Sequence, residues 1–337
     1  MKQLIVFSKA YIKSMRLYYS FITGIAGWIG VAYYQHLANS TGKIGTSNII
    51  KTIEISTPFV KQIVILIFLF MAWGVNQIVN DYLGLKEDRI NAPQRPMVSG
   101  RLNVKWALML SGFFMSIMFF TTWFYLEPIA LIPLVAGALL NVIYEYAKGH
   151  GVFGNITFGL MIGMCSLFGV FASGPLDVYL TKSRYAFTFL VILINGLMTF
   201  YTYFKDYKGD KLANKKTLVV IYGLRISRVI ALISSFLPVI FFLLMYYGLN
   251  LIDIEINNTF IILGIIYTFL QIWTGWLYFR HPYGAKTYFS LAANFRAAAC
   301  GQATLIALFN PELSMILFIV SYIFVGFLFD LHSNSKA

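Results

Sequence analysis

The sequence predicts an all-α membrane protein, a polytopic bundle of about nine transmembrane helices. Of its 337 residues 59% are hydrophobic and only 12% are charged, and its mean hydropathy is +0.73. A soluble domain carries roughly 25% charged residues, so this chain lacks the polar material to cover a surface that faces water. The apolar residues also gather in long continuous runs, which indicates helices that cross lipid.

Nine apolar runs are each long enough to span the membrane, since a spanning helix needs about 20 predominantly apolar residues. A further apolar segment, 285–309, is interrupted by Asn294 and Arg296. We expect it to form a surface or half-inserted helix, and a tenth span is the alternative. The nine predicted spans are residues 17–37, 59–79, 103–125, 127–146, 152–173, 185–204, 229–248, 259–279 and 312–330.

The first 16 residues differ from the rest of the chain because they alternate apolar side chains with Lys and Arg. This pattern predicts an amphipathic helix that lies in the membrane interface. The sequence therefore divides into an interfacial helix, residues 1–16, and a transmembrane domain, residues 17–331.

Basic residues fall mainly in alternate loops, which predicts the orientation of the chain in the membrane. Twenty of the 26 Lys and Arg residues lie in the segments on one side of the nine-span topology. That side, with the N-terminus, is predicted to be cytoplasmic, and an odd number of spans places the C-terminus outside. The same bias, together with attraction to anionic membrane lipid, accounts for the net charge of +13. No motif indicates a nucleic-acid partner.

Acidic residues are few, and two groups of them follow apolar spans on the predicted cytoplasmic side. Asp81 and Asp88 follow the second span, with Asn80 beside them, and Asp206 and Asp210 follow the sixth. Carboxylates at the hydrocarbon boundary are costly and are usually paired, ligated or functional. Mg²⁺ prefers a few carboxylates together with substrate phosphates, whereas the absence of a His or Cys cluster in the sequence argues against zinc or iron. Helix caps and Lys partners are the structural alternative for each group taken alone.

Three stretches of sequence resemble the UbiA superfamily of intramembrane prenyltransferases. The stretch NDYLGLKEDRINAPQRPMVSGRL, residues 80–102, is similar to the first aspartate-rich motif of that family. KDYKGDKLANKKTLVVIYG, residues 205–223, is similar to its second motif. YEYAKGHGVFGNITFGL, residues 144–160, is similar to its tyrosine-and-lysine loop. Order and spacing agree across roughly residues 15–280.

The resemblance implies a bundle around a central apolar cavity, Mg²⁺ as cofactor and an isoprenyl diphosphate as substrate. Carried over to this chain, it implies that the metal ligands and catalytic groups are Asn80, Asp81, Asp88, Asp206 and Asp210. It further implies that the groups that bind the substrate diphosphate are Arg95, Tyr144, Lys148 and Lys211.

One position departs from the family pattern, because Gly84 stands where the first motif has its middle aspartate. On a straight helix Asp81 and Asp88 lie about 10 Å apart along the axis, too far to share one ion. Glycine could permit a bend that brings them together. Alternatively, a ligand has been lost, and Glu87, water or the second motif completes the coordination.

Three functions are compatible with these features. The first is a prenyltransferase that ionises an isoprenyl diphosphate and transfers the prenyl group to an aromatic or lipid-precursor acceptor. The second is a terpene cyclase of the same superfamily, in which the chain's own double bond captures the cation; the third is a cation transporter. Both enzymes need aromatic faces near the cation, and the aromatic residues at the predicted membrane end are Tyr144, Tyr146, Tyr201, Tyr203 and Phe204.

Overall fold

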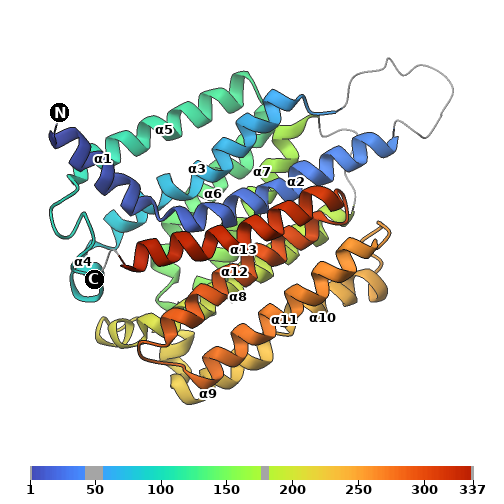
Figure 1. Ribbon diagram of the computed structural model, residues 1–337. Coiled ribbons are helices and arrows are strands. Elements are labelled where there is room, and N and C mark those ends of the chain that lie inside the picture. Colours follow the sequence, from blue (N-terminus) through green and yellow to red (C-terminus); the bar gives the residue numbers. More distant parts are fainter. Residues whose placement is uncertain (1, 42–55, 176–181, 335–337) are drawn as a thin grey trace.

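The computed structural model describes residues 2–41, 56–175 and 182–334, and almost all of them are helical. The prediction of an all-α bundle is confirmed (Figure 1). In chain order the elements are α1 Lys2–Met15, η1 Leu17–Tyr19, α2 Ser20–Thr41, α3 Phe59–Leu83, α4 Leu85–Asn91, α5 Val104–Phe124, η2 Pro128–Ala130, α6 Leu131–Ala147, β1 His150–Gly151, α7 Val152–Ser173, α8 Lys182–Leu212, β2 Lys216–Thr217, α9 Leu218–Ser234, α10 Leu237–Leu243, the π-helix η3 Leu244–Gly248, α11 Asn258–Arg280, α12 Thr287–Ile306 and α13 Pro311–Asn334.

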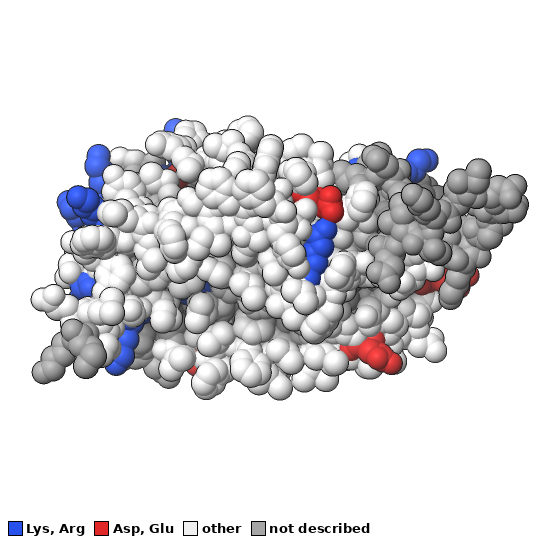
Figure 2. All heavy atoms as spheres, turned by 90° about the horizontal axis from the view of Figure 1, so that it is seen from above, with Lys and Arg blue, Asp and Glu red and all other residues white. Residues whose placement is uncertain are grey.

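The outside of the bundle is suited to lipid. Within the described residues, eight helical segments are long and apolar enough to cross a membrane. Large apolar side chains such as Phe113, Phe124 and Ile265 are exposed on them. Figure 2 shows one face with few charges over its middle and with most of the visible Lys and Arg toward the end where α1 and α4 lie. The helices therefore present hydrocarbon-like surfaces between two polar ends.

The prediction for residues 285–309 is wrong, because α12 is neither a surface helix nor half inserted. Nearly all of its side chains are buried, and it packs against α2, α8, α11 and α13. The polar residues that interrupt its hydropathy find partners on neighbouring helices: Asn294 Nδ2 donates to Met198 O at 2.9 Å, and Arg296 Nε donates to Tyr322 O at 3.1 Å. Internal hydrogen bonds of this kind make polar residues tolerable inside a membrane bundle.

The extra helix changes the predicted position of the chain's last span. With α12 as a full-length helix, α13 returns to the end of the bundle at which α4 lies (Figure 1). Phe329, near the end of α13, contacts Tyr18 with ring centroids 5.5 Å apart, and Tyr18 lies beside the start of α2. The expectation that the last span leaves the chain on the side opposite the aspartates is therefore wrong. Ser335 and the residues after it lie outside the described part of the chain.

The end of the bundle that carries α4, β1 and β2 also carries both aspartate groups, and it is called the aspartate end below. A short parallel pairing joins its two loops: His150 pairs with Lys216 and Gly151 with Thr217. The predicted span 229–248 begins earlier than expected, at α9, which contains a break at Gly223 with φ of 69°. Which end faces the cytoplasm, and whether α1 lies in the interface, stay predictions.

Candidate functional site

A polar pocket of about 100 Å³ lies at the aspartate end, between the ends of α3, α6 and α8. It brings together eight of the nine residues that the resemblance pointed to. The carboxylates of both motifs line the same pocket, although more than a hundred residues separate them in the sequence. The lining residues are Arg16, Tyr19, Trp73, Gln77, Asn80, Asp81, Gly84, Asp88, Arg95, Tyr144, Glu145, Lys148, Phe158, Thr202, Tyr203, Lys205, Asp206 and Asp210.

Two arginines hold the carboxylates of the first motif. Arg16 Nη2 donates to Asp81 Oδ1 at 2.7 Å, and Gln77 Nε2 donates to the same oxygen at 2.8 Å. Arg95 forms an ion pair with Asp88, and its Nη1 lies 3.5 Å from Asp81 Oδ1. Burial raises the pKa of Asp88, and attraction to Arg95 opposes that shift without cancelling it.

Both motif carboxylates reach a single guanidinium nitrogen because the helix is interrupted between them. Gly84 lies at the junction of α3 and α4, with φ of −88° and ψ of 12°. These angles are open to any residue, so the left-handed freedom of glycine is not used here. The helix is interrupted at Gly84, as the first of the two alternatives allows, and the reason for glycine must lie in its missing side chain. The Glu87 side chain lies outside the described side chains.

The second motif places one carboxylate in an ion pair and leaves another with an open oxygen. Lys205 Nζ lies 2.9 Å from both oxygens of Asp206. Asp210 is only 1% exposed, and its Oδ2 has no hydrogen-bond partner. Asn80 Oδ1 likewise is buried without a partner. Buried polar oxygens without partners are costly in a stable fold, so these two atoms are candidate ligand positions.

Lys148 lies at the centre of the negative charge. It follows α6 directly and lines the pocket. Burial lowers its pKa, but attraction to Glu145, Asp210 and Asp206 outweighs burial, so the net shift of the pKa is upward. Lys148 therefore carries a proton at neutral pH and can pair with an anionic substrate.

Lys211 and Tyr146 are not brought into this group. Lys211 is exposed, with its Nζ 6.0 Å from the centre of the Tyr207 ring. It follows Asp210 directly on α8. Successive side chains on a helix with 3.6 residues per turn project about 100° apart, so Lys211 points in a different direction from Asp210. Tyr146 is 69% exposed and points away from the pocket. Tyr201 is buried elsewhere, where its hydroxyl donates to Ala231 O.

Several residues of the pocket were not predicted as site residues. Arg16 belongs to the predicted interfacial helix and Lys205 begins the second motif, but neither was assigned a role, although each contacts a motif carboxylate. Tyr19 and Trp73 stack with ring centroids 4.3 Å apart, and Phe158 meets Trp73 edge-on at 5.6 Å. The sequence does contain a signal for Arg16, because the amphipathic pattern of the first 16 residues stops there. In the structure, Arg16 adopts a left-handed φ of 49°.

Glu145 is an acidic residue of the pocket that comes from neither motif. It is the only charged residue of α6, and its Oε1 accepts a hydrogen bond from Lys215 Nζ at 3.1 Å. A Cβ atom placed on Gly84 would lie 3.6 Å from Glu145 Oε1. The carboxylate of Glu145 thus lies beside the position where the first motif lacks its aspartate.

Among residues 2–41, 56–175 and 182–334, no three Asp, Glu, His or Cys side chains stand close enough together to hold a metal ion. Ion pairs with Arg16, Arg95 and Lys205 engage three of the motif carboxylates instead. A divalent cation would therefore have to exchange with these basic groups, which would then be available to a bound diphosphate.

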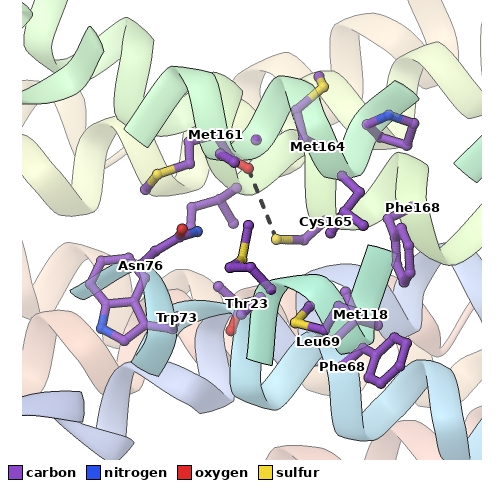
Figure 3. Close-up of a pocket in the computed structure, with 17 residues that line it drawn as sticks. Thr23, Phe68, Leu69, Trp73, Asn76, Met118, Met161, Met164, Cys165 and Phe168 are labelled. Atoms are coloured by element: carbon purple, nitrogen blue, oxygen red, sulfur yellow. Dashed lines mark hydrogen bonds between the residues drawn. The ribbon is translucent and has the colours of Figure 1, made fainter. Parts of the chain in front are cut away.

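A separate apolar cavity of about 40 Å³ borders the polar pocket, and Trp73 lines both. Figure 3 shows Met161 and Met164 on one side of this cavity and Met118 on the other, with Trp73 and Asn76 at one end. The walls come from α2, α3, α5, α6 and α7. An apolar cavity is therefore present among these helices, and it meets the polar pocket at Trp73.

Comparison with known proteins gives the same relationship from sequence and from fold. The model of the UbiA prenyltransferase family matches residues 54–292. A digeranylgeranylglyceryl phosphate synthase from Methanosphaera stadtmanae is 30% identical over 204 residues, which cover 59% of this chain and 71% of that protein.

Two solved structures share the fold at low sequence identity. A UbiA homologue from Aeropyrum pernix superposes with a TM-score of 0.62 at 15% identity, covering 88% of this chain and 97% of that one. A UbiA homologue from Archaeoglobus fulgidus, solved with GPP and Mg²⁺ bound, has a TM-score of 0.58 at 14% identity and covers 89% and 99%.

Proposed function

Because the chain belongs to the UbiA prenyltransferase family, we propose that it transfers the prenyl group of an isoprenyl diphosphate to a lipid-precursor acceptor in a Mg²⁺-dependent reaction. The observation that carries the proposal is the junction at Trp73, where a charged pocket meets an apolar cavity. An isoprenyl diphosphate has the same two parts, an anionic head and a hydrocarbon tail.

The basic side chains of the pocket bind the diphosphate and stabilise the negative charge that develops on it. Lys148, Arg95 and Lys205 line the same small space, and Arg95 and Lys205 are ion-paired with carboxylates in the absence of substrate. When the allylic C–O bond breaks, its electron pair leaves with the diphosphate. Positive groups that meet this charge lower the barrier.

Mg²⁺, when bound, supplies additional positive charge to the leaving group. Asp81, Asp88, Asp206 and Asp210 would hold it, together with Asn80. The donor set fits, because these are oxygen ligands of the kind that Mg²⁺ prefers. The buried oxygens without partners on Asp210 and Asn80 support the same assignment.

Aromatic rings and the exclusion of water protect the allylic cation that remains. Tyr144 and Phe158 lie edge-on with ring centroids 5.3 Å apart, next to the stacked Tyr19 and Trp73. Ring faces attract a cation, and a dry site prevents its capture by water. An acceptor hydroxyl then forms the new C–O bond and gives its proton to the released diphosphate.

A second cleft favours an acceptor with a polar, anionic head group. This cleft, of about 170 Å³, shares Arg16, Arg95 and Lys205 with the polar pocket and adds Lys13 from α1. Its far wall contains Phe295 of α12 and Phe329 of α13. A basic cleft with an apolar wall suits a phosphate-bearing lipid precursor, and the relative from Methanosphaera stadtmanae is named for a glyceryl phosphate product.

The test is product analysis with purified protein, isoprenyl diphosphates of several lengths, Mg²⁺ and two kinds of acceptor. We expect a prenylated glycerophosphate lipid, detected by mass spectrometry of organic extracts, and little product when the acceptor is omitted. Prenylation of an aromatic acceptor alone would contradict the choice of acceptor. Cyclic terpenes formed from the diphosphate alone would make the protein a cyclase.

Variants of the carboxylates test the role of the pocket. Asp88→Ala, Asp206→Ala and Asp210→Ala should each remove nearly all diphosphate release, because a clamp built from few ligands tolerates no loss. Glu127→Ala is the matched control: Glu127 pairs with Lys61 at 2.8 Å, and neither residue lines the pocket. Full activity in any two of the three aspartate variants would reduce the motifs to structural roles.

A further inference from the structure

Glu145 lies beside the position where the first motif lacks its aspartate. Gly84 lies on the wall of the polar pocket, and the nearest side-chain atom to its absent Cβ is Glu145 Oε1, at 3.6 Å. A carboxylate at position 84 would thus lie next to the carboxylate at position 145. The pocket holds one acidic group at this place, and it comes from α6 instead of from the end of α3.

We propose that Glu145 is a metal ligand of this protein and that it replaces, from a different helix, the carboxylate lost at Gly84. The proposal rests on the proposed function and deepens it, because it concerns the Mg²⁺ site of the same pocket. Glycine at position 84 then has an electrostatic reason, since it keeps a second negative charge away from Glu145.

The position of Glu145 in α6 points the same way. Glu145 lies in the last turn of α6, at the hydrocarbon boundary, where a carboxylate is costly and is usually paired, ligated or functional. Glu145 faces the pocket that also holds the buried Oδ2 of Asp210, which has no hydrogen-bond partner in the structure. One pocket of about 100 Å³ thus contains both an open ligand position and a carboxylate from outside the two aspartate motifs.

The alternative is that Glu145 serves only to hold Lys215, which precedes β2. Lys215 Nζ lies 3.1 Å from Glu145 Oε1, so the ion pair is present. A purely structural pair predicts that Glu145→Gln and Lys215→Met have similar effects and that neither changes metal affinity. A ligand role predicts that only the glutamate variant does.

The experiment measures Mn²⁺ binding by electron paramagnetic resonance, with purified protein and inorganic diphosphate, alongside the thermal unfolding midpoint. We expect Glu145→Gln to weaken Mn²⁺ binding at least about tenfold, the range found when groups that support a bound metal are lost. Lys215→Met should bind Mn²⁺ as well as the wild type. Glu127→Gln is the control for the loss of an ion-paired glutamate far from the pocket.

The decisive variant moves the carboxylate back to the first motif. Gly84→Asp combined with Glu145→Gln should recover Mn²⁺ affinity to within about threefold of the wild type, because a carboxylate is again present at this place in the pocket. The tenfold loss that it must offset corresponds to about 1.4 kcal/mol. Wild-type affinity in Glu145→Gln, or no recovery in the folded double variant, overturns the assignment of Glu145. Absence of Mn²⁺ binding by the wild type itself would instead overturn the Mg²⁺ site of the proposed function.

Discussion

Asp88 is a pocket residue whose buried negative charge lowers the stability of the folded protein. It is buried, and its pKa is raised above the ordinary value of 3.8 because burial penalises the carboxylate more than Arg95 stabilises it. A carboxyl whose pKa is higher in the folded than in the unfolded protein binds its proton more tightly when folded. Acidification through that pKa therefore does not destabilise the fold through this group.

Asp88→Asn is accordingly expected to separate stability from function. The neutral side chain removes the cost of a buried charge, so the thermal midpoint should stay equal or rise, while Mn²⁺ binding is lost. In the wild type, Mn²⁺ binding should fall with decreasing pH at a midpoint above 3.8. A calorimetric scan and a binding titration over the same pH range measure both. A fall in thermal midpoint for Asp88→Asn would show that the Arg95 ion pair is mainly structural.

The motif carboxylates could be predicted from the sequence, whereas their partners could not. Asp81, Asp88, Asp206 and Asp210 stand out because acidic residues are rare here and lie at the ends of apolar helices. Glu145 and Arg16 do not, because their roles depend on which side chains face them across a helix interface. Such contacts arise from packing between segments far apart in sequence, and no local spacing encodes them.

At the scale of elements, the pairing of β1 with β2 ties the two halves of the site together. Lys216 N donates to Gly149 O at 3.1 Å, next to Lys148 on one side and to the loop after Asp210 on the other. Two residues on each strand thus fix the position of Lys148, the proposed diphosphate-binding lysine, relative to Asp210, a proposed metal ligand.

Breaking this connection should weaken substrate binding more than it affects folding. Lys216→Pro removes the backbone donor, a bond worth about 0.5–1.5 kcal/mol, and should raise KM for the diphosphate several-fold with little change in the thermal midpoint. Lys216→Met keeps the backbone donor and alters only an exposed side chain, so its KM should match the wild type. Equal KM values in the two variants would show that the pairing does not position the site.

The buried position of α12 inside the bundle could not be predicted from the sequence. Hydropathy placed it at the surface because Asn294 and Arg296 interrupt the apolar run, yet both residues bond to backbone oxygens of neighbouring helices. Long apolar segments that face lipid were predictable, since a helix surface in contact with lipid needs only apolar side chains. An inner helix faces other helices, and small and paired polar residues suit it better than a uniform apolar surface.

For the whole molecule, the fold predicts that both motifs and the end of α13 lie on one side of the membrane. The pocket requires positions 91 and 214 to share a side, and the return of α13 brings the end of that helix to the same side. With Cys165 and Cys300 replaced by Ala, single cysteines at Asn91, Asn214 and Ser335 should all label from the cytoplasmic side.

A cysteine at Asn250, in the exposed loop between η3 and α11, should label only from the opposite side. The measurement is the accessibility of each cysteine to a membrane-impermeant maleimide in intact and in opened vesicles. Labelling of positions 91 and 214 from different sides would rule out a shared pocket. Labelling of position 335 from outside would restore the nine-span topology.

We expect the lining of the apolar cavity to determine how strictly this protein selects the length of its substrate. Met115, Met118, Met161 and Met164 all border a space of only about 40 Å³, so a long hydrocarbon tail enters only when these side chains change rotamer. Methionine has three rotatable side-chain bonds and adapts to irregular shapes at low cost. Selectivity then depends on the conformational energies of four thioethers instead of on a rigid wall, and we expect a broad tolerance for tail length that narrows when the methionines are replaced by β-branched residues.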